Sequence, residues 1–308
     1  MAFIKEKLKS TTGAELQLYK LIAKGKAKAA VHINHGMCEH SDRYERFAKF
    51  LSSNQYNVIA HDHRGHGLTT SHDAPLGTYA KNNGWQKVIA DVDAVNAAIR
   101  KQHPNLPIVY FGHSMGSIIG LNYCIHHSEK IAASALWNSG VDGGLLLNLY
   151  GLLLKIERIF KGSDVPSQIA KKLTFENWNK SFAPNRTQSD WLTTDDAEVD
   201  KYIADPLCGF DASNGLWSEL LSGIKTGATD SELSKIRNDL PIHLLAGGKD
   251  PCSDNGKAVE RLYTRLKKTG IKDTTLTLYK ENRHEALNEL NRDDVMQEFV
   301  AWLDERLA

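Results

Sequence analysis

The first 139 residues alternate between short apolar runs and stretches in which apolar residues recur at helical spacing. Strand-like runs cover residues 3–10, 14–22, 29–36, 56–61, 107–111 and 131–139. Helical spacing occurs in residues 41–54, 85–100 and 115–127. The first two runs flank Gly13 and predict an antiparallel pair of strands. The later alternation of strand and helix predicts a mostly parallel sheet with helices on both faces.

This alternation stops near Ser139. Residues 140–239 are helical in pattern and contain no convincing pair of strands. After them come a strand in "PIHLLAGGKDP" (241–251), a helix at 254–269, a strand in "TTLTLYKEN" (274–282) and a helix from about 294. The pattern predicts an α/β body made of residues 1–139 and 240–308. A helical cap at residues 140–239 would interrupt it.

Composition places the chain among ordinary globular proteins and narrows the range of partners. Of its 308 residues, 41% are hydrophobic and 24% charged, and a net charge of +1 gives no basis for binding nucleic acid. The first residues lack the apolar core of a signal peptide, and no run approaches a membrane span, so we expect a cytoplasmic protein. The four cysteines, Cys38, Cys124, Cys208 and Cys252, form no CxxC and predict reduced thiols without zinc.

The sequence "GHSMG", residues 112–116, stands between a predicted strand and a predicted helix. One interpretation is a tight turn in which small residues relieve crowding. The other is a nucleophile elbow, a strained turn that exposes the hydroxyl of Ser114 beside a helix N-terminus. A serine hydroxyl is a weak nucleophile and needs a histidine base, itself oriented by a carboxylate.

Both partners occur later in the chain, in the order that this kind of elbow requires. Asp250 follows the buried strand "IHLLAGG", and His284 follows the strand "LTLYKEN". Taken singly, Asp250 is also explained as a turn residue and His284 as a surface residue, and Asp254 competes as the acid. Together, the three positions predict a Ser114–His284–Asp250 triad. The N–H groups of Met115 and Met37 are the expected oxyanion donors.

Several segments together resemble the monoglyceride lipase and bacterial lysophospholipase branch of the α/β-hydrolase fold, which includes serine aminopeptidase-like members. They are "HINHGMCEHSDRYERFAKFL", "DHRGHG", "GHSMG", "LLAGGKDP" and "RHEALNE", with a weaker likeness in the cap at "DPLCGF". The resemblance implies the same triad and the same oxyanion donors. It also implies that Glu39 and His40 support the oxyanion loop. One departure is Met37-Cys38, where some relatives have two small residues.

Two further groups of residues invite a chemical role. The loop "HDHRGHG" holds His61, Asp62, His63 and His66, a possible metal set. Because no second cluster accompanies it, we predict a structural loop anchored by Asp62 and Arg64. Cys38 and Cys252 adjoin the predicted site and are expected to be buried thiols rather than nucleophiles.

The predicted cap contains a strongly apolar helix at residues 145–160. Leu146, Leu149, Tyr150, Leu153 and Phe160 lie at helical spacing, and further leucines extend this apolar face around the helix. One interpretation is a helix buried between cap and body. The other is a lid whose surplus apolar face meets acyl chains or touches a membrane surface transiently.

The sequence thus predicts a serine-dependent hydrolase of carboxylic esters that works through an acyl-enzyme, without metal or organic cofactor. The resemblance implies a monoacylglycerol or a lysophospholipid as the substrate. Aminopeptidase or thioesterase action on the same fold remains an alternative, because a triad does not specify the leaving group. A non-catalytic ligand-binding homologue is the alternative from another class.

Overall fold

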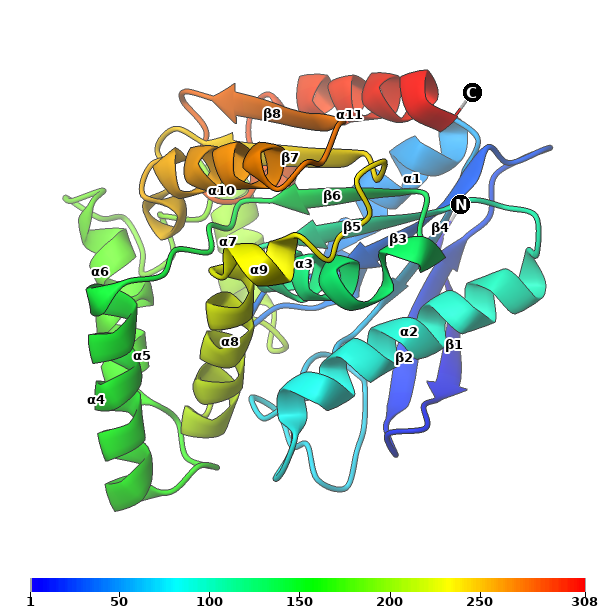
Figure 1. Ribbon diagram of the computed structural model, residues 1–308. Helices are drawn as coiled ribbons and strands as arrows, with labels where there is room; N and C mark the ends of the chain where they lie inside the picture. The colour runs from blue at the N-terminus through cyan, green and yellow to red at the C-terminus, as the bar shows by residue number, and fades with distance from the viewer. Residues whose placement is uncertain (1, 308) are drawn as a thin grey trace.

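The computed structural model describes residues 2–307 and contains an eight-stranded sheet in the order β1-β2-β4-β3-β5-β6-β7-β8 (Figure 1). The strands are β1 (Ile4–Lys9), β2 (Glu15–Leu21), β3 (Ala29–Asn34), β4 (Tyr56–His61), β5 (Ile108–His113), β6 (Ala133–Trp137), β7 (Ile242–Gly247) and β8 (Thr274–Tyr279). Strand β2 pairs antiparallel with β1 and β4, and all other neighbours pair in parallel. The predicted antiparallel opening pair and mostly parallel sheet are confirmed.

The helices follow the predicted order. Those interleaved with the strands are η1 (Ser41–Tyr44), α1 (Glu45–Ser53), α2 (Gly84–Gln102), α3 (Met115–His127), η2 (Ser128–Lys130), η3 (Pro251–Ser253), α10 (Lys257–Lys268), η4 (Ala286–Asn288) and α11 (Arg292–Leu307). Between β6 and β7 lie α4 (Leu145–Lys161), α5 (Gln168–Leu173), α6 (Phe175–Lys180), α7 (Asp196–Ala204), α8 (Asn214–Gly227) and α9 (Asp230–Leu233).

The helix predicted from residue 254 begins three residues later than expected, at Lys257. Asp254, Asn255 and Gly256 all have positive φ, with values of 53°, 54° and 86°. A right-handed helix requires negative φ, so these three residues form a turn that ends before α10.

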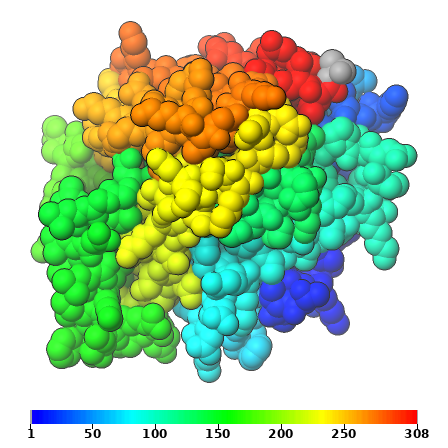
Figure 2. Space-filling view, in the orientation of Figure 1, coloured from blue at the N-terminus to red at the C-terminus, as the bar shows by residue number. Residues whose placement is uncertain are grey.

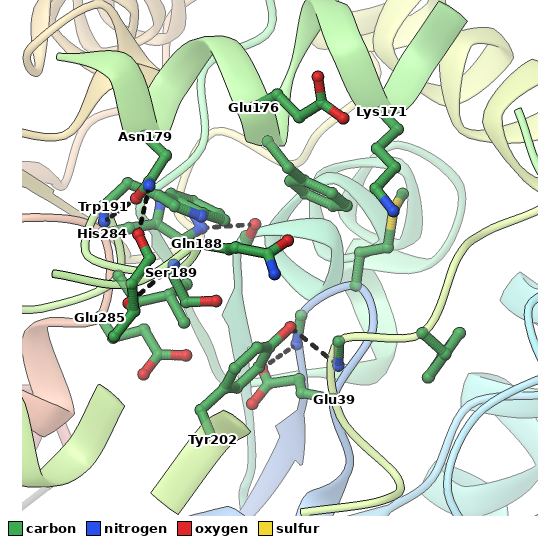
Figure 3. Close-up of a pocket in the computed structure, with 18 of the residues that line it drawn as sticks. Glu39, Lys171, Glu176, Asn179, Gln188, Ser189, Trp191, Tyr202, His284 and Glu285 are labelled. Carbon is green, nitrogen blue, oxygen red and sulfur yellow. Dashed lines mark hydrogen bonds between the residues drawn. The ribbon is translucent and has the colours of Figure 1, made fainter. Parts of the chain in front are cut away.

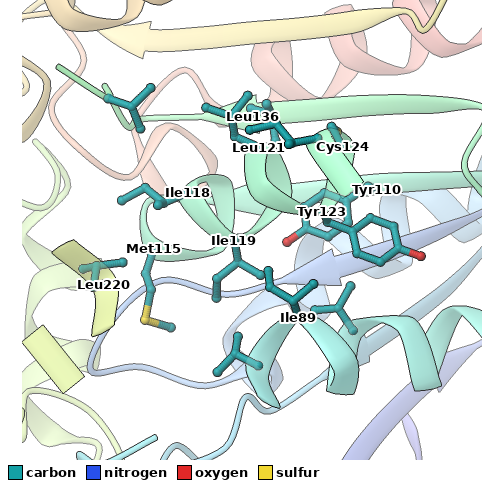
Figure 4. Close-up of a cluster of buried hydrophobic side chains, with 14 of the residues drawn as sticks. Ile89, Tyr110, Met115, Ile118, Ile119, Leu121, Tyr123, Cys124, Leu136 and Leu220 are labelled. Atoms are coloured by element: carbon teal, nitrogen blue, oxygen red, sulfur yellow. The ribbon is translucent and has the colours of Figure 1, made fainter. Parts of the chain in front are cut away.

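Buried strands carry apolar residues on both faces of the sheet. In β5, Ile108 and Tyr110 belong to the core on one face, while Val109 and Phe111 belong to the core on the other. The first face packs on α2, α3, α8 and α10, and the second on α1 and α11. Figure 4 shows part of the first core, where the rings of Tyr110 and Tyr123 stack 5.9 Å apart. This is why the strands read as continuous apolar runs.

The arrowheads of β6 and β8 point toward the side of the molecule where α4, α5 and α6 lie (Figure 1). Helix α8 packs against α3 and α2, and α4 packs against α8 at the edge of the molecule (Figure 2). The segment between β6 and β7 therefore stands beside the carboxyl ends of the parallel strands. Within residues 2–307, no helix is both long enough and apolar enough to cross a membrane.

Helix α4 exposes most of its apolar surface. Only Leu154 and Glu157 of this helix are buried, whereas Leu145, Leu146 and Phe160 are 83%, 82% and 84% exposed. The interpretation of α4 as a helix buried between cap and body is therefore wrong. The predicted apolar face is also divided: Tyr150 packs against the core, but Leu146 points away from it.

Five histidines gather without solvent exposure where β3 and β4 end. They are His32, His35, His61, His63 and His66. Nε2 of His32 lies 2.9 Å from Nδ1 of His61, and Nε2 of His35 accepts a hydrogen bond of 2.9 Å from the His63 N–H. Because Nε2 of His35 accepts from a backbone N–H, this nitrogen carries no proton and the ring of His35 is neutral.

Asp62 and Arg64 organise this loop as predicted. The Asp62 carboxylate accepts hydrogen bonds of 2.8 Å from the N–H groups of Ser41 and Leu68. Nε of Arg64 donates to Asp91 over 2.7 Å, and neither Asp62 nor Arg64 is exposed. Every charge in the loop is thus paired or hydrogen-bonded, and the structural interpretation of "HDHRGHG" is confirmed.

The buried histidines predict acid-sensitive stability. Burial lowers the pKa of His32 and His66 to about 4 and the pKa of His61 well below its usual value of 6.5. The unfolded chain takes up these protons as the pH falls through 6.5, whereas in the folded chain His32 and His66 take them up only near pH 4 and the pKa of His61 stays well below 6.5. The contribution of these histidines to the free energy of unfolding is therefore fully present above pH 6.5. As the pH falls below 6.5 it decreases by about 1.4 kcal/mol per pH unit for each histidine that stays neutral in the folded chain.

Urea unfolding measured at half-unit steps from pH 7.5 to 4.5 checks this prediction. The free energy of unfolding should fall below pH 6.5 with the slope of several histidines. His72→Gln, at an exposed position, is the matched control and should leave the slope unchanged. A free energy that stays constant from pH 7 to 5 would contradict the prediction.

Candidate active site

Ser114 occupies the turn between β5 and α3 in a strained backbone conformation. Its φ of 52° and ψ of −115° lie outside the regions that residues other than glycine normally adopt. A hydrogen bond of 2.9 Å from the Ser114 N–H to the Trp137 carbonyl oxygen ties the turn to β6. The turn thus has the geometry of a nucleophile elbow.

The two glycines of "GHSMG" are required by close approaches between backbones. A Cβ on Gly112 would lie 2.3 Å from the carbonyl oxygen of Gly116, and a Cβ on Gly116 would lie 2.2 Å from that of Asn34. Both distances are far below contact, so a larger residue at either position forces the backbone to move. The glycines therefore allow strand, helix and the loop after β3 to meet at Ser114.

The structure brings Ser114, His284 and Asp250 into one hydrogen-bonded chain. Nε2 of His284 lies 2.9 Å from Oγ of Ser114, and Nδ1 lies 3.0 Å from both carboxylate oxygens of Asp250. Asp250 is fully buried and His284 is 2% exposed. Asp254 turns away to Arg261 at 3.3 Å, and Gly256 rather than Asp254 precedes α10. A helix beginning at residue 254 would have given Asp254 the role of its N-terminal cap, and the later start of α10 rules this role out.

The environment of His284 keeps the ring basic although it is buried. Burial alone would lower the pKa of His284, but the charge and hydrogen bond of Asp250 outweigh it, and the pKa rises above its usual value. Glu285 and Glu39 add to the increase. The neighbouring His113 has no such partner, and burial lowers its pKa to about 4. One basic histidine therefore faces Ser114.

The two predicted oxyanion donors belong to segments that adjoin Ser114. Met115 is the first residue of α3, where a backbone N–H has no acceptor within the helix. Met37 follows Gly36, and a Cβ on Gly36 would lie 3.3 Å from Cβ of Ser114. The loop after β3 therefore passes beside the hydroxyl, and both Ser114 and Met37 line the same cavity.

This cavity has a volume of about 420 Å³ and is lined by Ser114 and His284. Figure 3 shows His284 among the other side chains of the wall. The segment between β6 and β7 supplies most of its wall. That segment contributes Lys171, Phe175, Glu176, Asn179, Gln188, Trp191, Tyr202 and Phe210. The ring of Trp191 lies 4.8 Å from the ring of His284, so this segment reaches the reacting groups.

The segment between β6 and β7 also contacts the loop that carries Met37. The carbonyl oxygen of Cys38 accepts hydrogen bonds from Tyr202 Oη at 3.0 Å and from the Gly209 N–H at 2.9 Å. Nε2 of His40 lies 2.8 Å from the Asp205 carboxylate. The carboxylate of Glu39 accepts from the Gly36 N–H over 2.6 Å. Glu39 and His40 thus support the loop in the way that the resemblance implies.

Two sets of possible metal ligands lie within the described residues, each with donor atoms within 4.8 Å of one another: His40, Asp205 and Cys208, and Asp250, Cys252 and His284. In each set the histidine is already hydrogen-bonded to the aspartate, which accounts for their proximity without an ion. Burial raises the pKa of Cys38 and Cys252, so both remain thiols rather than reactive thiolates.

Sequence patterns did not identify three residues that the structure places around the site. Arg43 forms ion pairs with both Glu39 and Glu285, and Trp191 covers His284. For Glu285, the position directly after His284 was the available signal. Arg43 lies in a quoted motif but has its partner 242 residues away. Trp191 lies in the predicted cap, where aromatic side chains more often form the core of the helices than line a site.

The comparisons with known proteins agree with this geometry. Residues 25–291 match the family described as Serine aminopeptidase, S33. The monoglyceride lipase of Rattus norvegicus is 28% identical over 287 residues, 92% of this chain and 85% of that protein. A thermostable carboxyl esterase from Bacillus coagulans matches with a TM-score of 0.89 at 23% identity over 100% of both chains. A lipase solved in an open form matches with a TM-score of 0.87 at 26% identity over 99% of both chains. The fold is that of the α/β hydrolases, and the chain belongs to the Serine aminopeptidase, S33 family.

Proposed function

We propose that this protein hydrolyses carboxylic esters through an acyl-enzyme formed on Ser114. The observation that carries the proposal is the unbroken chain of hydrogen bonds from Ser114 through His284 to Asp250, opening into a cavity. The match to a family of serine hydrolases and the identity to a monoglyceride lipase support it.

In this mechanism His284 takes the proton of Ser114 as the hydroxyl attacks the ester carbonyl. Asp250 holds the ring in the tautomer that presents Nε2 to the serine and stabilises the imidazolium that forms. The N–H groups of Met37 and Met115 stabilise the oxyanion. His284 then protonates the leaving alcohol and activates the water that releases the acid. The steps use no metal or organic cofactor.

A monoacyl lipid, either a monoacylglycerol or a lysophospholipid, is the proposed substrate class. The name of the rat relative supports a glycerol ester. Apolar side chains on the cavity wall, including Phe175, Trp191, Leu192 and Phe210, offer contacts for an acyl chain. Polar side chains on the same wall, such as Asn179 and Gln188, offer hydrogen bonds to an alcohol. No nucleic acid enters this proposal, and a cytoplasmic location stays a prediction from the sequence.

We further propose that residues 140–239 act as a cap on the body formed by residues 1–139 and 240–308. The exposed leucines of α4 support a lid that touches a lipid surface transiently while the substrate enters. Lys155 and Arg158 on the same helix would remain in the lipid headgroup region.

A hydrolysis profile tests the proposed function. The substrates are p-nitrophenyl esters, monoacylglycerols, lysophospholipids, acyl thioesters and aminoacyl amides. Preferred turnover of oxygen esters with a monoacyl lipid supports the proposal. Preferred turnover of aminoacyl amides would favour the aminopeptidase alternative, and preferred turnover of thioesters the thioesterase. Failure to react with a serine-directed fluorophosphonate would favour a non-catalytic homologue.

The first prediction for the triad concerns additivity. Ser114→Ala, His284→Ala and the double variant should each lower kcat by about 10⁴- to 10⁶-fold, because the residues act as one unit. Steady-state kinetics of the three variants on one ester make the comparison. If the losses multiplied in the double variant, the two residues would not cooperate and the assignment would fail.

The second prediction separates the two candidate acids. Asp250→Asn should fold yet lose about 10⁴-fold in kcat, because the amide favours the wrong histidine tautomer. Asp254→Asn, at a carboxylate paired with Arg261, is the matched control and should keep its turnover. The assignment of Asp250 is wrong if only the Asp254 variant loses activity while both retain the fold.

The third prediction concerns α4. Replacing the exposed Leu146 and Leu149 with serine should raise KM for long-chain monoacylglycerols by about tenfold or more, since each leucine contributes apolar contact. Turnover of acetate esters and the thermal midpoint should stay unchanged. Leu154→Ser is the matched control, because Leu154 is 1% exposed and its loss should lower the midpoint. Uniform loss on short and long esters in the double variant would contradict a lid.

A further inference from the structure

Arg43 contacts three parts of the protein around the proposed triad. From η1, its guanidinium forms an ion pair with Glu39 on the oxyanion loop. Its two terminal nitrogens donate to the Glu285 carboxylate over 2.7 Å and 2.8 Å, in the loop that carries His284. Its guanidinium carbon also lies 4.9 Å from the centre of the Tyr202 ring in α7.

These groups are buried, so their charges act strongly on one another. The side chains of Arg43, Glu39 and Glu285 are 12%, 3% and 6% exposed. Removing one partner of a buried ion pair leaves an uncompensated charge. One positive charge faces two negative charges here. Together the three side chains therefore carry one excess negative charge beside the triad.

Each contact of Arg43 leads to a functional part of the proposed site. Glu39 accepts from the Gly36 N–H, which precedes the proposed oxyanion donor Met37. Glu285 follows His284 directly, and its N–H donates to the carbonyl oxygen of Leu192 over 2.7 Å. Tyr202 donates to the carbonyl oxygen of Cys38. The oxyanion loop, the histidine loop and α7 therefore share one guanidinium.

We propose that Arg43 is a positioning residue that holds the oxyanion loop and the histidine loop in register and balances the charges of Glu39 and Glu285 beside His284. The inference rests on the proposed function and adds a residue that contacts no reacting atom. It makes two separable claims. The forked geometry of Arg43 supports turnover, and its charge offsets those of Glu39 and Glu285 and so lowers the pH at which His284 becomes a free base.

The electrostatic claim depends on every charged or titratable group around His284. These are Asp250 and Cys252 after β7, His113 in β5, Glu39 after β3, Arg43 in η1 and Glu285 itself. The cap adds the uncharged Trp191 next to the ring, with Lys171, Glu176, Lys180 and Asp211 on the cavity wall. Among these, Arg43 and Glu285 have opposite charges and can be changed one at a time.

Opposite substitutions should therefore move the pH profile in opposite directions. Glu285→Gln removes a negative charge that favours the imidazolium, so the acid limb of kcat/KM should move to lower pH by about 0.5 to 1 unit. Arg43→Met leaves both carboxylates unbalanced, and the limb should move to higher pH by a similar amount. Arg43→Lys keeps the charge but loses the fork, so the limb should stay in place while kcat falls about tenfold or more with little change in KM.

Arg46→Met is the matched control. Arg46 also joins the body to α7, through Glu198 at 2.6 Å, but it makes no contact with Glu39 or Glu285 among the ion pairs of residues 2–307. Its loss should leave the acid limb unchanged. Thermal midpoints of all variants show which of them fold. If Arg43→Met does not fold, Glu285→Gln and Arg43→Lys still separate charge from geometry.

A proton NMR titration of the His284 ring gives the same pKa without turnover, and it separates failure of this inference from failure of the proposed function. Equal ester turnover by Ser114→Ala and the wild-type chain would overturn the proposed function while leaving the titrations informative. The inference is supported by shifts of opposite sign in Glu285→Gln and Arg43→Met with none in Arg46→Met. Shifts of the same sign in the two variants would overturn the inference. An unchanged His284 pKa with uniformly lower thermal midpoints would also overturn it, because Arg43 would then have only a structural role.

Discussion

The strained backbone of Ser114 is the constraint on which the rest of the site depends. A residue with a side chain adopts a φ of 52° together with a ψ of −115° only when the surrounding structure holds it there. Those surroundings are three backbones that meet at contact distance, β5, α3 and the loop after β3, and they meet because Gly112 and Gly116 carry no Cβ. The same approach also brings the loop that carries Met37, a proposed oxyanion donor, close to Ser114.

The remaining groups of the site reach this point from the far end of the chain. Parallel pairing of β7 and β8 with the rest of the sheet delivers Asp250 and His284 to the same edge as Ser114. Residues 140–239 supply most of the cavity wall. They also contact Cys38 and His40 of the loop after β3, and Arg43 next to that loop. The proposed cap is therefore more than a cover, because it contacts the loop that carries the proposed oxyanion donor Met37.

The sequence predicted the sheet well, and it named the three residues that the structure joins by hydrogen bonds, because the pattern around each of them is local. The continuous apolar run of β5 and the glycines around Ser114 are recognisable within a few positions of the sequence. The start of α10 was missed because residues 254–256 adopt left-handed conformations that helical spacing does not reveal. The exposure of Leu146 and the partners of Arg43 depend on contacts made only in the folded chain. The spacing of apolar residues shows which side of a helix is apolar, but it does not show which part of the protein covers that side.

The central claim, that Ser114 carries the acyl group, is tested most directly by trapping the intermediate. The enzyme is mixed with an activated p-nitrophenyl ester, quenched in acid within one turnover and analysed by peptide mass spectrometry. The account predicts a mass increase of one acyl group on the peptide containing Ser114, and none in the Ser114→Ala variant. Acylation of another residue, or turnover without any acylated peptide, would contradict it.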